Sequence, residues 1–291
     1  MTKITRKIMG ILASLVLLCG MTLSATAAFS FSNEIIVVSR EEGSGTRGAF
    51  IELLGIEKKD ESGAKIDYTT DEALITNNTA VMMTTVAGNA YAIGYLSLGS
   101  LNDSIKALQV DGVEATAENI KAGEYTVSRP FNIATKDDVS EAAQDFIAFI
   151  LSAEGQEVVA KNGYIALEDA PAYEGAQVSG KVAVAGSSSV TPVMEKLKEA
   201  YASLNPNAEI EIQTSDSSIG MQSTIDGICD IGMASRELKV SELEAGIVPT
   251  VIAMDGIAVI VSLDNPVDSL TKEQIQQIFT GEITEWDEVS E

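Results

Sequence analysis

Three short runs of strand-forming residues in this chain each end in a loop rich in serine and glycine, and a stretch with helical spacing follows each loop. The loops are EEGSGT at 41–46, AGSSSVTP at 185–192 and SDSSIG at 215–220. Strands that alternate with helices favour an α/β fold with mainly parallel sheets and flanking helices. In such sheets ligands bind at the carboxyl ends of strands, where helix N-termini leave backbone N–H groups unpaired. Each loop is therefore a candidate for holding an anion.

The spacing of apolar residues predicts the other elements. Strands are predicted at 34–39, 89–98, 105–113, 181–186, 208–214 and 257–262, and helices at 47–55, 140–164, 191–207 and 271–281. The last helix begins with a capping box of Thr271 and Gln274 and ends at Gly281. Residues 58–72 are acidic but lack the spacing of a calcium loop, so we expect a solvated loop there. Residues 171–180 carry the turn formers of a linker.

The first 28 residues have the pattern of an export signal. Three basic residues precede an apolar run at 8–23, and the small-residue sequence SATAA follows it. We expect cleavage near Ala27 or Ala28 and a location outside the cytoplasm, at the cell surface or in a periplasm. A lipid anchor at Cys19 is the second interpretation, although Leu18 stands before it where a small residue is expected.

The charge of the chain excludes several classes of partner. The net charge is −24, and without the basic residues of the signal it is about −27, which argues against nucleic acid or an anionic membrane as a partner. A small anion would need a local positive pocket of backbone N–H groups and one or two arginines. The chain has no histidine, and Cys229 is the only cysteine after the signal. We therefore expect no disulfide within the chain, no catalytic residue, no metal site and no cofactor.

Arg40 is the candidate anion ligand of the first loop. Its guanidinium can present a planar fork to an oxyanion, and Glu42 is predicted to hold that fork in place. The alternative is an exposed ion pair between the two, and a Ser-Gly loop by itself is most often a helix cap and a turn.

Four segments together resemble one known family. They are SREEGSGTRGAF at 39–50, GSSSVTPVMEKL at 186–197, DIGMASRELK at 230–239 and LTKEQIQQIFTGEITEWDEV at 270–289. They are similar to the phosphate-binding protein of Pst-type bacterial ABC importers over nearly all of residues 33–289. The resemblance implies a two-lobed periplasmic-binding-protein fold of type II, which closes around one dehydrated phosphate. It also implies a monomer that is no enzyme and that meets the permease subunits of an importer.

The order of these segments departs from the family. Family members begin with the segment that resembles GSSSVTP, whereas this chain begins with SREEGSGT, which indicates a circular permutation. The cut would lie between Val289 and Glu34, and residues 171–180 would join the family's usual termini. We expect one lobe of residues 33–103 plus 263–291, and a continuous second lobe of residues 104–262.

The resemblance also implies the phosphate ligands. The first lobe would supply Arg40, Ser44, Gly45 and Thr46, the second lobe would supply Ser188, Ser189, Ser217 and Ser235, and Glu42, Asp216 and Arg236 would support them. Ser235 stands where other members place an aspartate that accepts the proton of phosphate, so Glu42 or Asp216 would have to accept it here, or the rejection of sulfate would be weaker.

Other functions remain alternatives at this point. The chain lacks the Gly-x-x-x-x-Gly-Lys-Ser/Thr pattern of a nucleotide loop, and neither Ser44 nor Ser188 has a histidine or a Ser-x-x-Lys lysine to activate it. A carboxylate-metal phosphatase is not excluded by residue types. A receptor or sensor for another oxyanion, such as sulfate or molybdate, and a domain-swapped product of the permutation also remain.

Overall fold

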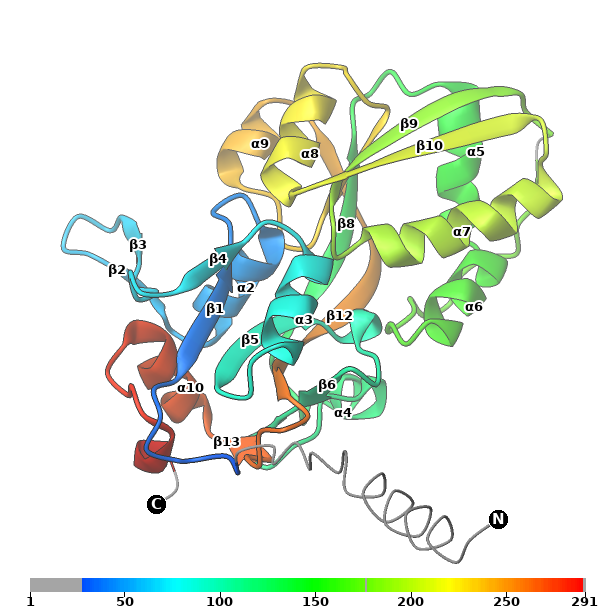
Figure 1. Cartoon of the computed structure of the whole chain (residues 1–291). Coiled ribbons are helices and arrows are strands. Elements are labelled where there is room, and N and C mark those ends of the chain that lie inside the picture. Colours follow the sequence, from blue (N-terminus) through cyan, green and yellow to red (C-terminus); the bar gives the residue numbers. More distant parts are fainter. Residues whose placement is uncertain (1–27, 176, 290–291) are drawn as a thin grey trace, which may run out of the picture.

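The computed structural model describes residues 28–175 and 177–289, which form two lobes joined by two long strands (Figure 1). The principal sheet has nine strands in the order β10-β9-β11-β8-β12-β5-β1-β4, with β6 paired to β12. The connecting strands are β8 (Ser128–Thr135) and β12 (Val248–Ser262), which lie in the middle of this order and pair with each other antiparallel. The sheet is therefore continuous from one lobe to the other.

The first lobe combines both ends of the described chain. Its core packs Phe50 against Tyr95 with ring centroids 3.9 Å apart, and both side chains are buried. The elements of this lobe are β1 (Ile36–Arg40), α2 (Gly45–Leu53), β2 (Glu57–Lys59), β3 (Lys65–Asp67), β4 (Leu74–Thr76), α3 (Thr79–Ala87), β5 (Ala92–Ser97), η1 (Leu98–Ser100), β6 (Ile105–Ala107), β7 (Gln109–Val110), α4 (Ala117–Lys121), β13 (Ser269–Leu270), α10 (Lys272–Thr280) and η2 (Trp286–Val289).

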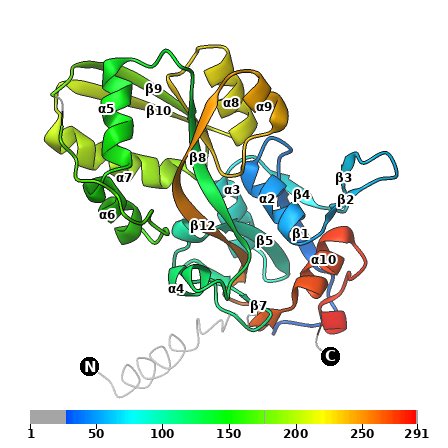
Figure 2. The same ribbon diagram turned by 180° about the vertical axis from the view of Figure 1, so that it is seen from behind.

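The second lobe has its own core under the parallel strands β9 and β10. Helix α7 faces this core through Leu197 and Tyr201, both fully buried, as the apolar spacing of the helix predicts. Figure 2, seen from behind, shows α5 and α6 on the same side as α7 and shows α8 and α9 at the other end of the lobe. The elements are α5 (Glu141–Ile150), α6 (Ala153–Lys161), β9 (Gly180–Ser187), α7 (Thr191–Leu204), β10 (Ala208–Ser215), α8 (Ser217–Ile225), β11 (Ile231–Ala234) and α9 (Val240–Glu244).

The α/β fold is confirmed, but the sheet is mixed where mainly parallel strands were expected. Strands β1, β4 and β5 pair in parallel, and so do β9, β10 and β11. In contrast, β8 and β12 pair antiparallel with all of their partners. The difference arises because these two strands carry the chain between the lobes in opposite directions, a role that apolar spacing alone does not reveal.

Most predicted elements are present, with four changes. The strand expected over 105–113 is divided into β6 and β7, which pair with β12 and β13 respectively. The helix expected over 140–164 is interrupted at Ser152, whose side chain accepts the Gly155 N–H at the start of α6. The loop expected over 58–72 contains the exposed hairpin β2–β3. The strand expected over 257–262 is the second part of the longer β12.

The two hydrophobic cores show that the chain passes from one lobe to the other within β8 and β12. Leu108, Tyr125 and Ile257 pack in the core of the first lobe, although the predicted boundaries at 103 and 263 assign them to the second. The physical reason is pairing, because β6 forms a ladder with β12 and so brings the chain after residue 104 back to the first sheet.

The two ends of the described chain lie side by side. The Ile35 N–H donates to the Thr284 carbonyl at 2.7 Å, and the Trp286 N–H donates to the Asn33 carbonyl at 3.2 Å. Trp286 is fully buried. The segment that leads into β1 and the segment after α10 therefore form one packed unit.

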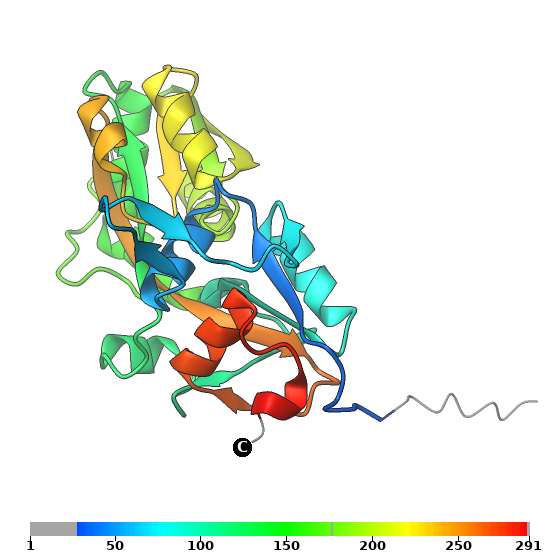
Figure 3. The ribbon, with the colours of Figure 1, turned by 90° about the vertical axis from the view of Figure 1, so that its left-hand side faces the viewer.

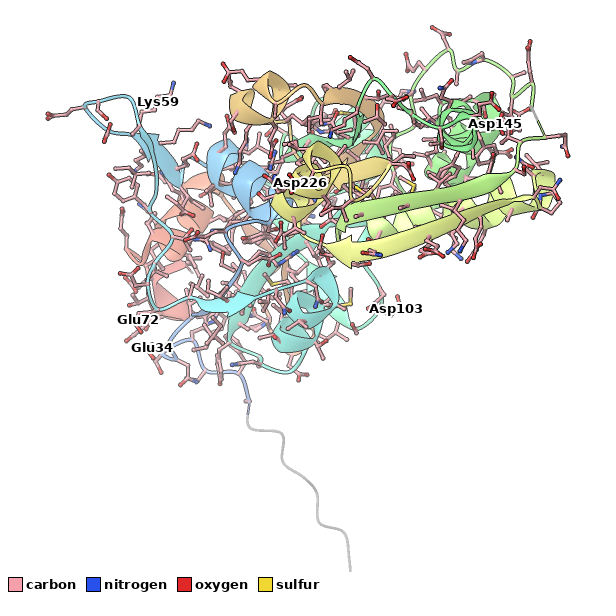
Figure 4. All side chains as sticks on the ribbon, turned by 90° about the horizontal axis from the view of Figure 1, so that it is seen from above. Glu34, Lys59, Glu72, Asp103, Asp145 and Asp226 are labelled. Atoms are coloured by element: carbon pink, nitrogen blue, oxygen red, sulfur yellow. The ribbon has the colours of Figure 1, made fainter. Side chains whose placement is uncertain are left out.

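The linker is held on the second lobe through a buried carboxylate. Tyr173 donates its hydroxyl to Asp145 Oδ2 at 2.6 Å, and Tyr201 of α7 donates to the same oxygen at 2.7 Å. Figure 4 shows Asp145 on α5 at the end of the molecule opposite Lys59 of the β2–β3 hairpin. Residues before β9 are thus fixed to α5 and α7 far from the first lobe.

The predicted export signal lies outside the described residues except for Ala28, and so does Cys19. Among residues 28–175 and 177–289, no helix combines the length and the apolar character needed to cross a membrane.

Candidate functional site

Four helices begin where the two lobes face each other. Helices α2 and α3 belong to the first lobe, and α7 and α8 belong to the second (Figures 1 and 3). The first N–H groups of a helix have no partner within the helix, and the aligned peptide dipoles add a partial positive charge at that end. The convergence of four such ends creates a positive environment for an anion in a strongly acidic protein.

The hydroxyl groups at these helix ends touch across the boundary between the lobes. Thr46 Oγ1 of the first lobe lies 2.7 Å from Ser189 Oγ of the second. Thr79 Oγ1, also of the first lobe, lies 3.2 Å from Ser188 Oγ and 3.3 Å from Ser189 Oγ. All four side chains are buried. The contacts join the two lobes through groups that can donate hydrogen bonds to an oxyanion.

Arg40 is the buried cation of this cluster, with 2% of its surface exposed. Its Nη2 donates to Ser188 Oγ at 3.2 Å, so the guanidinium reaches from the first lobe to the second. It also makes a two-pronged contact with Glu41, at 2.8 Å from Nε and 2.7 Å from Nη2. The predicted partner Glu42 is instead exposed. Strand β1 ends at Arg40, and the carboxylate that meets the guanidinium is the one directly after it.

Ser217 and Ser235 complete the second lobe's share of the cluster. Ser217 Oγ accepts the Ser235 N–H at 3.1 Å, and Ser187 donates to Ser235 Oγ at 3.0 Å. Gly45 packs against both from the first lobe, because a Cβ at this glycine would lie 2.4 Å from Ser217 Oγ and 2.8 Å from Ser235 Oγ. The lobes can approach this closely only because residue 45 has no side chain.

The other predicted residues lie around this cluster. Ser44 is the N-cap of α2 and accepts the Arg47 N–H at 3.3 Å. Asp216 is the N-cap of α8 and accepts the Ile219 N–H at 2.8 Å. Arg236 is paired at 2.9 and 2.8 Å with Glu242.

The pKa of Glu242 is held low despite burial. Burial alone would raise it, but hydrogen bonds from the Arg236 guanidinium and the Lys239 N–H lower it below the usual range. Both arginines are paired with a carboxylate, and of the two it is Arg40 that donates to a serine of the hydroxyl cluster.

Sequence reasoning missed Thr79, Ser187 and Glu41. Thr79 is the first residue of α3, and Asn78 before it accepts the Val81 N–H at 2.9 Å as the N-cap. A signal was present, because Asn78 precedes the apolar run AVMM and is a favoured capping residue. The loop before α3 lacks the Ser/Gly richness that identified the other three.

A cavity of about 910 Å³ adjoins the cluster between the lobes. Its lining includes Glu41 and Thr79 from the first lobe and Ser188, Thr191 and Asp216 from the second. Within the described part of the chain, no group of three or more His, Cys, Asp or Glu side chains is arranged to hold a metal ion. The cluster can donate hydrogen bonds to an anion from hydroxyls, N–H groups and one guanidinium.

Comparison with known proteins points to one family. The model of the PBP superfamily domain matches residues 29–154 and 171–291. The chain is 57% identical over 268 residues to "Phosphate-binding protein PstS 2" of Streptococcus agalactiae, covering 92% of each chain. It is 46% identical over 267 residues to a protein of the same name from Streptococcus pneumoniae, covering 91% of each. A crystal structure of a phosphate-binding protein of a phosphate ABC transporter, also from Streptococcus pneumoniae, matches with a TM-score of 0.70 and 45% identity, covering 89% of this chain and all of the other.

Proposed function

Because this chain belongs to the PBP superfamily, and within it to the family of the phosphate-binding proteins PstS, we propose that it captures inorganic phosphate between its lobes outside the cytoplasm and delivers it to an ABC importer. The observation that carries this proposal is the buried contact of Arg40 and two threonines of the first lobe with serines of the second. An oxyanion placed among these groups receives hydrogen bonds from both lobes at once.

The proposed mechanism is closure. In the open form, water competes for the phosphate oxygens and screens the Arg40 charge. When the lobes close, the hydroxyls of Thr46, Ser189 and Ser235 are removed from water, and each hydrogen bond to the anion gains strength in the lower dielectric. The energy of these bonds offsets the cost of dehydrating the anion. A closed form that exists mainly with phosphate bound is a shape that permease subunits can distinguish.

The permuted chain order is part of the proposal. The packing of the residue 33–35 segment against residues 284–286 supports it, because a cut between two adjacent surface segments leaves the lobe intact. The anchoring of Tyr173 on Asp145 supports a linker that spans the second lobe without crossing the cleft. The relatives of 57% and 46% identity align with more than nine-tenths of both chains in one stretch, so they share this order of segments. We propose that this chain closes around the anion and works as a monomer.

An enzymatic function is not favoured. Ser188, which accepts from the Arg40 guanidinium, also contacts Thr79, and the chain has no histidine to act as a base. We propose that the protein binds phosphate and releases it unchanged.

Calorimetric titration of the phosphate-stripped chain, residues 29–291, tests the function. We expect tight binding of one phosphate per chain, with weaker binding of sulfate and molybdate. Preferential binding of sulfate or molybdate would assign the protein to another oxyanion. A folded sample that bound none of the three would refute the proposal, and release of phosphate from a chromogenic ester would revive the hydrolase alternative.

A further inference from the structure

The strands that connect the lobes carry a buried ion pair that lies outside the hydroxyl cluster. Arg129 of β8 and Asp255 of β12 face each other in register, and Nη2 of Arg129 lies 3.1 Å from Oδ2 of Asp255. The exposed fractions of the two side chains are 2% and 0%. Burying two charges costs free energy unless each is well compensated by its partners.

Arg129 is less well compensated than the other buried arginines. Arg40 and Arg236 each bind a carboxylate through two nitrogens. Arg129 binds Asp255 through Nη2 alone, and its Nε and Nη1 are buried without a hydrogen-bond partner. Buried donors of a charged group are seldom left in this state. The charge of Arg129 is therefore compensated mainly by Asp255 and by the ring of Phe131, whose centroid lies 5.5 Å from the guanidinium carbon.

The pair is connected to Arg40 through β5. Ser97 of β5 donates to Asp255 Oδ1 at 2.9 Å. Two residues earlier on the same strand, the hydroxyl of Tyr95 accepts the Arg40 N–H at 3.2 Å and contacts Ser39 Oγ at 2.9 Å. Alternate residues of a strand share one face, so β5 supports both the ion pair and the phosphate arginine. The positive charges of Arg40 and Arg129 are also close enough to disfavour each other.

On the basis of the proposed phosphate binding, we propose that Arg129 and Asp255 are positioning residues for the anion: Arg129 supplies a second positive charge behind Arg40, and a proton taken up by Asp255 releases that charge to act on the bound phosphate. An anion beside two mutually repelling guanidinium groups relieves their repulsion and binds more tightly. While Asp255 is ionised, it neutralises Arg129 and weakens this effect.

The surroundings of Asp255 make proton uptake accessible near neutral pH. Burial raises the pKa of Asp255 to about 6, against the opposing effect of Arg129 and of hydrogen bonds from Ser97 and the Gly99 N–H. The other groups that face this carboxylate are the hydroxyls of Tyr125 and Tyr164, whose pKa values are themselves raised by burial. These tyrosines stay neutral near neutral pH. Among the groups that face one another here, Asp255 is therefore the one that changes charge in this pH range.

The test compares phosphate affinity of the wild-type chain and Asp255→Asn from about pH 5 to pH 8. The ratio of their dissociation constants cancels the ionisation of phosphate itself. We expect Asp255→Asn to bind roughly tenfold more tightly at pH 8, as one unopposed charge at this range implies, and equally at pH 5. The matched control is Asp268→Asn, which removes an exposed carboxylate paired with Lys106 and should leave the ratio constant across the range.

Arg129 is tested with two substitutions. Arg129→Met should weaken binding at every pH, and Arg129→Lys should recover part of the loss because it restores the charge. If Asp255→Asn does not fold, the carboxyl carbon of Asp255 is titrated by ¹³C NMR in the wild-type protein. Bound phosphate should raise the pKa of Asp255, because the proposal has phosphate binding more tightly to the protonated form.

Several outcomes would overturn the inference. These are a pH-independent ratio for Asp255→Asn, an unchanged affinity in Arg129→Met, or a carboxyl pKa that does not respond to phosphate. A wild-type chain that bound no phosphate would refute the proposed function as well, whereas normal wild-type binding with a constant ratio would refute only the role of the ion pair.

Discussion

At the residue scale, Arg40 is a guanidinium whose position is fixed on three sides. Tyr95 accepts its backbone N–H, Glu41 binds its Nε and Nη2, and Ser188 of the other lobe accepts from Nη2. A cation fixed in this way loses little conformational entropy when an anion binds, because its rotamer is already selected.

We therefore predict that Arg40→Ala weakens phosphate binding by roughly a hundredfold or more, since charge-assisted hydrogen bonds in a buried site are lost together. Arg40→Lys keeps the charge but not the planar fork, so its phosphate affinity should lie between that of the wild type and that of Arg40→Ala. Calorimetric titration measures both. Lys196→Ala, which removes one exposed positive charge from α7, is the matched control, and an equal affinity of Arg40→Ala and the wild type would remove Arg40 from the site.

A second prediction concerns the close approach at Gly45. Gly45→Ala places a methyl group against Ser217 Oγ and Ser235 Oγ, so the lobes cannot close fully and phosphate affinity should fall by about tenfold or more. Gly48→Ala in the same helix is the control, because the nearest atom to its added Cβ is Arg236 Cδ at 3.8 Å. Equal affinities of the two variants would mean that closure does not bring Gly45 against these serines.

At the element scale, helix α10 begins at a capping pair that the sequence displays. The Thr271 side chain accepts the Gln274 N–H at 3.1 Å, and the Gln274 side chain accepts the Thr271 N–H at 2.9 Å. Helix α10 then ends at Gly281, which has a φ of 78°, a conformation that glycine adopts without strain.

We predict that Thr271→Ala lowers the free energy of unfolding by about 1 kcal/mol, the usual cost of losing an N-cap, and leaves phosphate affinity unchanged. Urea denaturation and calorimetry measure the two quantities. Thr280→Ala, at the other end of the same helix, should have a smaller effect on stability. A loss of phosphate affinity in Thr271→Ala would show that α10 contributes to the site, contrary to its position away from the hydroxyl cluster.

At the scale of the whole molecule, the connecting strands β8 and β12 decide both the lobe boundary and the electrostatics between the lobes. They pair in the middle of the sheet, and the buried pair of Arg129 and Asp255 lies where they pass from one core to the other. A charge buried at this place is linked to the stability of the entire fold.

The fourth prediction follows from the raised pKa of Asp255. The folded chain holds the Asp255 proton more tightly than the unfolded chain, where the pKa is about 4. The stability that this proton contributes is present below about pH 4 and is lost as the pH rises through about 6. Thermal unfolding of the phosphate-free chain should therefore show this loss in the wild type and in Asp268→Asn but not in Asp255→Asn. The same pH dependence in all three would contradict the assignment to Asp255.

The sequence by itself determined the α/β class, most of the elements and the loops that form the site. Strand and helix periods, the capping pairs and the Ser/Gly loops are local signals, readable because each depends on residues within a few positions of one another. The resemblance of four segments then named Arg40, Ser44, Gly45 and Thr46 together with Ser188, Ser189, Ser217 and Ser235, whose part in binding phosphate stays a prediction.

Only the tertiary structure decided which groups meet. Thr79 reaches Ser188 across 109 positions of sequence, and Glu41 rather than Glu42 binds Arg40 because of how the chain turns after β1. The pairing of Arg129 with Asp255 and the mixed sheet depend on two strands 126 residues apart being brought together. Such contacts form only when the whole chain folds around its two cores, and no local pattern in the sequence carries that information.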